Sequence, residues 1–234
     1  MGQCTYINWR SPAKVGSCPG VTEIWVAAGT YKPTTGTDRN AYLSLKNGIG
    51  IYGGFAGTET ARSQRNLEVN PTILSADIGV PNDRNDNSYH IFSNTNIGPT
   101  AILDGFTLTG GNANGSPGIQ GNTGAAILNY TEASPTIRNC VFSGNSSEYG
   151  ALANIYNSVP AVTNCSFIGN LAYRGAAIYN FGSSPSIVNC SFSGNQVTNN
   201  GSSMLNSASS ALPSNPTITN CIIWGKRRFE FSEF

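Results

Sequence analysis

A 25-residue repeat constrains the fold of this 234-residue chain more than any other feature of its sequence. Three segments align without gaps, and a fourth follows after a longer connection: SPTIRNCVFSGN (134–145), VPAVTNCSFIGN (159–170), SPSIVNCSFSGN (184–195) and NPTITNCIIWG (215–225). Each period holds short β-branched or aromatic runs between Gly, Ser, Asn and Pro, which predicts three short strands per coil. We therefore expect an all-β, right-handed parallel β-helix, a solenoid of about nine coils.

Stacked coils place equivalent residues directly above one another, at the roughly 4.8 Å spacing of paired strands. The repeat thus predicts an inward aliphatic column of Ile137, Val162, Ile187 and Ile218, and an inward aromatic column of Phe142, Phe167 and Phe192. A third column contains Asn139, Asn164, Asn189 and Asn220. Asn tolerates left-handed backbone geometry, so we expect sharp bends there, with amides stacked from coil to coil.

Four of the six cysteines also form a column: Cys140, Cys165, Cys190 and Cys221. A metal site needs ligands that converge on a point, and in-register side chains rarely offer the torsion near 90° of a disulfide. Buried free thiols are therefore favoured for this column. Cys4 and Cys18 bracket a loop outside the repeat, and there a disulfide and two free thiols are both open alternatives.

The chain divides into three parts around the repeat. We expect an N-terminal cap or loop at residues 1–20, the β-helix at 21–225, and a capping strand or truncation tail at 226–234. An uncovered end of a coil stack exposes unpaired strand edges. End-to-end self-association is therefore one hypothesis for this chain.

Composition excludes several kinds of partner. Only 11% of residues are charged and the net charge is +1, which gives no support to binding of nucleic acid or anionic membranes. No apolar run approaches the ~20 residues of a membrane span, so we do not expect a membrane-spanning protein.

The order of motifs resembles a bacterial right-handed β-helix family related to the polymorphic outer-membrane proteins. The residues that carry the resemblance are IWVAAGTY (24–31), IYGGFAGTET (51–60) with the arginines after it, TILSADI (72–78), DGFTLTGGNA (104–113), GAAI at 124–127 and 175–178, and FSGN, FIGN and FSGN at 142–145, 167–170 and 192–195. The resemblance covers roughly residues 21–225 and implies a pectate-lyase-like fold. It further implies a secreted or cell-surface bacterial protein with an adhesion or structural role, whose partner is a glycan or protein on a host or neighbouring cell.

The main alternative is a carbohydrate-binding or polysaccharide-degrading protein, because sugar lyases and hydrolases share this fold class. Their chemistry needs paired carboxylates, or calcium with a basic residue, on one outer face. Two predicted outward columns contain no acid: Arg138, Thr163, Val188, Thr219 and Val141, Ser166, Ser191, Ile222. We therefore expect a non-enzymatic module with no catalytic residues. A lesser alternative, an ice-binding or self-assembling fibre module, is disfavoured because Thr is mixed with other residues in these columns.

One acidic segment could bind a cofactor. Asp77, Asp83 and Asp86 alternate with Asn in DIGVPNDRNDN (77–87), and such oxygens can bind Ca²⁺, although a solvated turn is the favoured interpretation. No other cofactor is expected. His90, the only histidine, is interpreted as a structural surface residue, and Asp104 as the cap of a tight turn.

Overall fold

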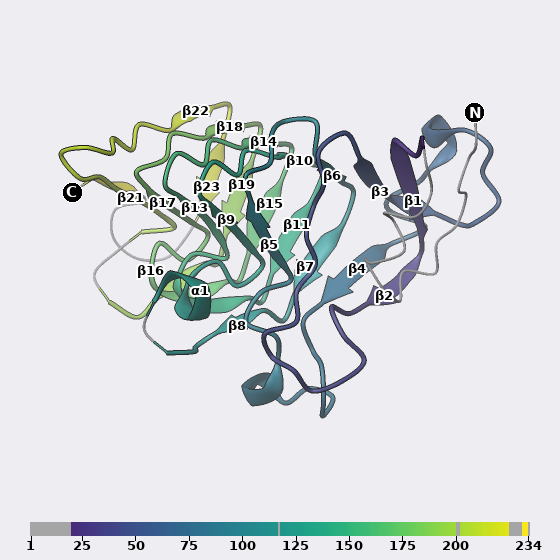
Figure 1. The fold of residues 1–234 in the computed structure, drawn as a ribbon, viewed down its shortest axis with the longest axis horizontal. Helices are drawn as coiled ribbons and strands as arrows, with labels where there is room; N and C mark the ends of the chain where they lie inside the picture. The colour runs from purple at the N-terminus through teal and green to yellow at the C-terminus, as the bar shows by residue number, and fades with distance from the viewer. Residues whose placement is uncertain (1–19, 117, 200–201, 225–230, 234) are drawn as a thin grey trace.

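Strands from successive coils pair in parallel and form four sheets, which we call A to D, in the computed structural model (Figure 1). The structure describes residues 20–116, 118–199, 202–224 and 231–233. Sheet A contains β1 (Glu23–Ala27), β3 (Gly50–Phe55), β6 (Ile102–Asp104), β10 (Thr136–Arg138), β14 (Ala161–Thr163), β18 (Ser186–Val188) and β22 (Thr217–Thr219). Sheet B contains β2 (Gly29–Tyr31), β4 (Thr72–Ser75), β7 (Thr107–Thr109), β11 (Val141–Ser143), β15 (Ser166–Ile168), β19 (Ser191–Ser193) and β23 (Ile222–Trp224).

The other two sheets complete each coil. Sheet C contains β5 (Phe92–Thr95), β9 (Ile127–Tyr130), β13 (Leu152–Ile155), β17 (Ile178–Phe181), β21 (Met204–Ser207) and β24 (Phe231–Glu233). Sheet D contains β8 (Asn112–Ala113), β12 (Ser146–Tyr149), β16 (Leu171–Arg174) and β20 (Gln196–Val197). Short helices lie in the connections: η2 (Arg62–Gln64), η3 (Arg84–Asp86) and α1 (Ile119–Asn122).

The regular repeats show how one coil is built. The strands β10, β11, β12 and β13 enter sheets A, B, D and C in turn, and the next coil repeats this order. The strands β10, β14 and β18 begin 25 residues apart, and Ile137 pairs with Val162, which pairs with Ile187. The predicted parallel β-helix with a repeat near 25 residues is confirmed.

Two details differ from the expected coil. A coil of the regular repeats has four strands instead of three, because the polar segment after each FxxN motif, such as Ser146–Tyr149, forms its own strand in sheet D. Sheets A and B each contain seven strands in the described part of the chain, fewer than the nine coils expected. The difference arises because connections outside the regular repeats are long, as between β3 and β6.

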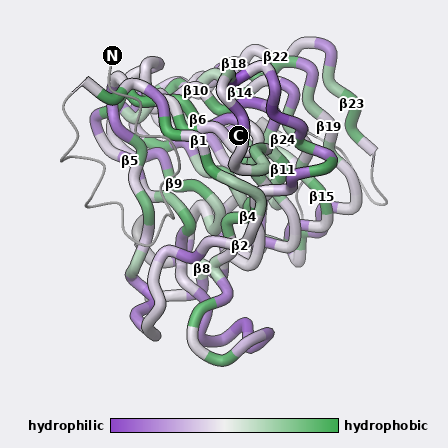
Figure 2. Tube along the Cα trace, turned by 90° about the vertical axis from the view of Figure 1, so that its right-hand side faces the viewer, coloured by the Kyte–Doolittle hydropathy of each residue, from purple (hydrophilic) through white to green (hydrophobic). Residues whose placement is uncertain are grey.

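The interior of the stack is one apolar cluster, to which the inward-facing columns contribute their side chains. Phe142 and Phe167 stack with ring centroids 4.5 Å apart, and Phe167 and Phe192 follow at 5.0 Å. Leu108 precedes Phe142 in the same column of sheet B. Hydrophobic segments recur in strands of successive coils (Figure 2).

A second, smaller apolar layer lies on the outer face of sheet C. It consists of the buried Leu128, Ala153 and Ile155, with Tyr130, Tyr156, Tyr179 and Phe181 packed against them. Both faces of this sheet are therefore largely buried over the regular coils.

The two ends of the chain are only partly described. Residues 1–19, which hold most of the predicted cap together with Cys4 and Cys18, lie outside the described residues. At the other end, β24 pairs in parallel with β21 and extends sheet C by one strand. Among the described residues, no helix has the length and apolar character needed to cross a membrane.

Candidate functional site

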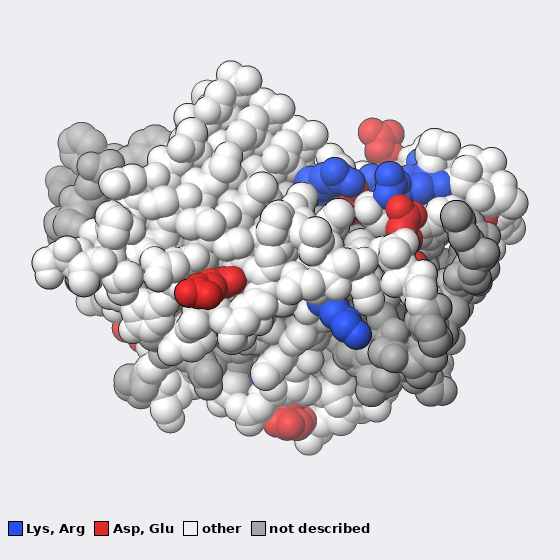
Figure 3. Space-filling model, turned by 45° about the horizontal axis from the view of Figure 1, so that its top comes forward, with Lys and Arg blue, Asp and Glu red and all other residues white. Residues whose placement is uncertain are grey.

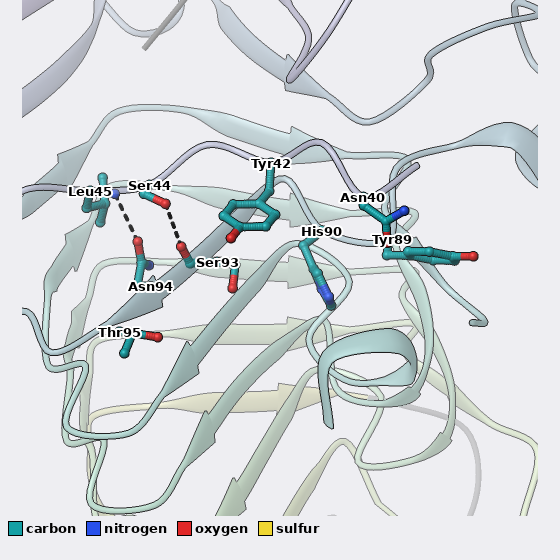
Figure 4. Close-up of a pocket in the computed structure, with 9 residues that line it drawn as sticks. All are labelled: Asn40, Tyr42, Ser44, Leu45, Tyr89, His90, Ser93, Asn94 and Thr95. Atoms are coloured by element: carbon teal, nitrogen blue, oxygen red, sulfur yellow. Dashed lines mark hydrogen bonds between the residues drawn. The ribbon is translucent and has the colours of Figure 1, made fainter. Parts of the chain in front are cut away.

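A polar cavity of about 410 Å³ lies at the N-terminal end of sheet C (Figure 4). Its walls come from the segment 40–45, from the residues just before β5, and from β5 itself. The segment 40–45 runs beside β5, because Leu43 forms a parallel bridge with Phe92. Volumes of about 300–1,000 Å³ are typical of small-molecule sites. We call this cavity the Tyr42 groove; it is lined by Asn40, Tyr42, Ser44, Leu45, Tyr89, His90, Ser93, Asn94 and Thr95.

Two hydrogen bonds attach the outer wall of the groove to β5. The Ser44 hydroxyl donates to the Ser93 carbonyl at 2.8 Å, and the Leu45 amide donates to Oδ1 of Asn94 at 2.9 Å (Figure 4). Asn94 is buried, and its own amide donates to Asn129 in the next coil. The wall is therefore held by the buried framework of the stack.

The alternation along β5 decides which side chains line the floor. Phe92 and Asn94 are buried, whereas Ser93 is half-buried and Thr95 is exposed. Above this strand, the Tyr42 side chain is half exposed and its ring lies over Ser93 (Figure 4). The groove thus combines one accessible aromatic ring with hydroxyl groups on one rigid strand.

His90 lies at the inner side of the groove, and its interpretation as a surface residue was wrong. The residue is buried, and Nδ1 lies 3.0 Å from the Gly124 carbonyl oxygen. A carbonyl oxygen only accepts, so Nδ1 carries the proton in this contact. His90 therefore connects the start of β5 to the turn that precedes the next coil.

The lining of the Tyr42 groove contains hydroxyl, amide, imidazole and phenol groups but no carboxyl group among its described residues. Glycoside hydrolysis by the common mechanism needs two carboxyl groups across the scissile bond. An aromatic face with surrounding hydroxyl and amide groups suits binding of a polar ring without such chemistry.

The structure does not assemble the candidate calcium site. Asp77 accepts from the Asn82 amide, Asp83 accepts from the Asn85 amide at 2.9 Å, and Asp86 accepts from the Val80 amide at 2.6 Å. Within the described residues, no group of three His, Cys, Asp or Glu side chains could hold a metal ion. Each carboxylate instead satisfies a backbone amide of its own turn, and Asp83 caps η3.

The Asn139 column occupies left-handed bends, but its amides form only a sparse ladder. The φ angles are between 51° and 54° at Asn139, Asn164, Asn189 and Asn220. The Asn164 amide reaches Oδ1 of Asn139 at 3.4 Å, a long contact, whereas the Asn139 amide donates to Asp104 at 2.8 Å.

Another asparagine column, not predicted from the sequence, forms a continuous ladder through five strands of sheet C. Its members are inward-facing residues of sheet C: Asn94, Asn129, Asn154, Asn180 and Asn206. Each amide donates to the next carbonyl oxygen at 2.8–3.0 Å. Its signal in the sequence is the recurring Asn of ILN, LAN and IYN in the GAAI-like segments.

The cysteine column consists of free thiols, three of them buried. Burial raises the pKa of the Cys165 thiol well above its ordinary value. The hydrogen bond from Cys165 lowers the pKa of Cys190, while burial raises the pKa of the partly exposed Cys221. Carbonyl oxygens of the same and the preceding coil lie near each sulfur, as at Cys165, where Thr163 O is 3.4 Å away.

A further correction concerns the outward column of sheet A. Asp104 pairs in register with Arg138, so the column of Arg138, Thr163, Val188 and Thr219 does contain an acid one coil earlier. The register was missed because these two residues are 34 positions apart instead of 25. Asp104 is buried and its carboxylate accepts from the side chains of Arg65, Arg138 and Asn139, and from no backbone amide among the described residues, so its interpretation as the cap of a turn was wrong.

Comparison with protein-family models finds no match, and neither the curated proteins nor the solved structures give one. The class of this protein therefore follows from its own architecture. It is a parallel β-helix of stacked coils with a polar groove on sheet C.

Proposed function

We propose that this chain is a non-enzymatic surface module that binds carbohydrate in the Tyr42 groove. The observation that carries the proposal is the composition of the groove. A half-exposed Tyr42 ring faces the hydroxyl-bearing strand β5, and no carboxyl group lies among the described lining residues. Sugar rings present apolar C–H faces and many hydroxyl groups, so they match an aromatic ring beside polar side chains.

The rigidity of the wall supports this proposal. The segment 40–45 is attached to β5 through Ser44 and through Asn94, which belongs to the buried amide ladder. A site that is rigid before binding loses less conformational entropy when the ligand arrives. The floor residues Ser93 and Thr95 are therefore presented at fixed positions.

The motif resemblance supports a location outside the cell. The GAAI segments and the FSGN, FIGN and FSGN segments resemble the bacterial family related to the polymorphic outer-membrane proteins. By this resemblance we propose a secreted or cell-surface protein with an adhesion or structural role. Its partner is then a glycan, or a glycan-bearing protein, on a host or neighbouring cell.

A polysaccharide-degrading function is less well supported. The buried carboxylate on the outer face of sheet A, Asp104, has its two oxygens engaged by Arg65 and Arg138 at 2.7 Å each. Because both carboxylate oxygens are engaged within the protein, this group is poorly placed to act on a bound sugar. The Tyr42 groove offers no carboxyl group to pair with it.

The experiment is a glycan array followed by titration calorimetry on the best ligand. We expect Tyr42→Ala to weaken binding about tenfold or more, because the ring loses its stacking surface. Tyr42→Phe keeps that surface and retains most of the affinity. Thr95→Val, which removes one hydroxyl at nearly constant shape, weakens binding about fivefold. Tyr173→Ala changes another exposed tyrosine on sheet D and is the matched control.

The length of the bound glycan is measured in the same samples by size-exclusion chromatography, with and without calcium. An unchanged length supports a binding module. Shortening of the glycan contradicts the non-enzymatic part of the proposal. Equal affinity of the wild type and Tyr42→Ala, or an array without any ligand, contradicts the assignment of the groove.

A further inference from the structure

Three arginines gather above one buried carboxylate on the outer face of sheet A. Arg65 Nη2 lies 2.7 Å from Oδ1 of Asp104, and Arg138 Nε lies 2.7 Å from Oδ2. The third, Arg62, lies over the Tyr52 ring at 4.5 Å and pairs with Glu23. Figure 3 shows these basic groups as a row, beside a broad face of the coils that is nearly free of charge.

The three guanidinium groups differ in their exposure and in how many of their nitrogens already have an acceptor. Arg65 is mostly buried, and its Nη1 also approaches the carbonyl oxygens of Asp104 and Gly53 at 3.3 and 3.5 Å. Arg138 is anchored to Asp104 through Nε, and its side chain is 38% exposed. Its two terminal nitrogens have no acceptor among the described residues, so they are available to a ligand.

The charges of this cluster do not balance. Asp104 and Glu23 are the acids in ion pairs with the three arginines, so one positive charge remains. The Asp104 oxygens are already occupied, since the Asn139 amide also donates to Oδ1 at 2.8 Å. Arg62 is also partly exposed but is paired with Glu23, so the excess charge is accessible at Arg138.

Polar groups of the next coil line the depression around Arg138, which we call the Arg138 groove. Thr163 and Asn164 line the same depression as Arg138 and Asn139. Thr163 is half-buried and pairs in register with Arg138 on the neighbouring strand. Its hydroxyl makes no hydrogen bond within the part of the chain that the structure describes. A hydroxyl and an amide thus lie beside the exposed guanidinium.

We propose that this groove binds one acidic group of a carbohydrate chain, either a carboxylate or a sulfate ester. The two terminal nitrogens of Arg138 donate a bidentate pair of hydrogen bonds to two oxygens of the acidic group, the geometry in which guanidinium binds such groups best. The Thr163 hydroxyl and the Asn164 amide exchange hydrogen bonds with neighbouring sugar hydroxyls, because each can donate and accept. This site lies on a different sheet from the Tyr42 groove and does not depend on it.

Two features favour an acidic sugar over nucleic acid. A nucleic acid carries a phosphate at every nucleotide and needs several cations in a row, whereas this cluster has one unbalanced charge. Single strands also need an open aromatic ring for base stacking. The nearby ring, Tyr52, is buried and covered by Arg62.

The test is calorimetric titration of the whole chain, carrying Tyr42→Ala so that the Tyr42 groove does not contribute, with three size-matched hexasaccharide probes: uncharged, carboxylated and sulfated. We expect at least one acidic probe to bind, with the neutral probe at least tenfold weaker. Arg138→Gln is expected to abolish this preference, whereas Arg138→Lys retains part of it. Arg174→Gln changes another exposed arginine, on sheet D, and is expected to leave the preference unchanged. Affinity for the acidic probe should fall with added salt, since the pair is partly exposed.

Arg138→Gln also removes a partner of buried Asp104, so its fold is checked by circular dichroism and thermal unfolding. Thr163→Val leaves the ion pairs intact and should weaken binding of the acidic probe severalfold. The proposal is overturned by equal affinity for neutral and acidic probes, by no binding of any probe at millimolar concentration, or by full affinity in both Arg138→Gln and Thr163→Val. Displacement of the acidic probe by single-stranded DNA at equal concentration would assign the groove to nucleic acid instead.

Discussion

The side-chain amide of Asn129 donates from Nδ2 to Oδ1 of Asn154 in the next coil, at 2.9 Å. Asn154 in turn donates from Nδ2 to Oδ1 of Asn180 at the same distance, and Asn129, Asn154 and Asn180 are fully buried. Each amide therefore uses a donor and an acceptor along the stack, in a part of the interior that excludes water. Satisfied buried networks of this kind fix one register between coils.

Asn154→Ala tests the ladder. The change leaves the Asn129 donor and the Asn180 acceptor buried without their partner, so we expect a loss of about 3 kcal/mol in the free energy of unfolding. Urea unfolding followed by circular dichroism measures it. Asn164→Ala, in the exposed column with a 3.4 Å contact, is the control and should cost about 1 kcal/mol for its left-handed bend. Equal losses for the two variants would contradict a special role of the buried ladder.

The Asn129 and Asn139 columns show how far the sequence could predict this fold. Asn129 and Asn154 have the same 25-residue spacing as Asn139 and Asn164, so the period alone gives coil stacking for both. Only strand alternation tells which column faces inward. On sheet C this alternation is hidden, because outward positions such as Leu128 and Ala153 are buried under the second apolar layer.

The two candidate sites lie where the period fails. Tyr42 and Thr95 are brought together by a coil with long connections, and Asp104 meets Arg138 across a spacing of 34 residues. The period aligns Arg138 with Thr163 in the second site, but no regular pattern aligns Asp104 with Arg138 or Tyr42 with Thr95, so sequence could assemble neither site in full. The polar strands of sheet D were missed for a related reason, since Ser146–Tyr149 carries no apolar alternation.

Gly150→Ala tests the close approach of the turn before sheet C to the next coil. Gly150 has φ +65°, and an added Cβ would lie 2.6 Å from the Leu152 oxygen and 2.8 Å from the Tyr179 nitrogen. Gly169 has nearly the same φ, +61°, with open space around it. Both changes cost about 1 kcal/mol for the left-handed backbone. Gly150→Ala should cost at least about 2 kcal/mol more, because backbone atoms must shift. Thermal and urea unfolding of the two variants give the difference, and a similar cost for both would refute the packing argument.

Cys221 should be the accessible thiol of the cysteine column. It is partly exposed, whereas Cys140, Cys165 and Cys190 are buried. In a Cys4→Ser, Cys18→Ser background, we expect one thiol to react with a disulfide reagent in the native state and four after denaturation. Burial raises the pKa of Cys221, so its reaction should keep accelerating at pH values above the range in which an ordinary thiol ionises. Adding Cys221→Ser should remove the native-state reaction, and persistence of that reaction would place an exposed thiol elsewhere in the column.

Tyr179 should make the fold sensitive to alkaline pH. Burial, with the neighbouring Tyr149 as a second cause, raises the pKa of Tyr179 to about 12. In the unfolded chain a tyrosine has a pKa of about 10. Below pH 10 both states keep the proton and the stability is fully present. Between pH 10 and 12 the unfolded state loses its proton first, so the free energy of unfolding falls as the pH rises.

Tyr179→Phe has no proton to lose and should resist this fall. Relative to pH 8, we expect the variant to gain at most about 2 kcal/mol over the wild type by pH 12, after allowance for the partial exposure of the ring. Urea unfolding at pH 8, 10 and 11.5 measures the gain, and the tyrosinate absorbance of the variant should show one late-titrating group fewer than that of the wild type. Tyr42→Phe, whose ring is half exposed, is the control and should follow the wild type. Parallel stability curves for the wild type and Tyr179→Phe would show that the outer layer of sheet C does not hold this hydroxyl in its neutral form.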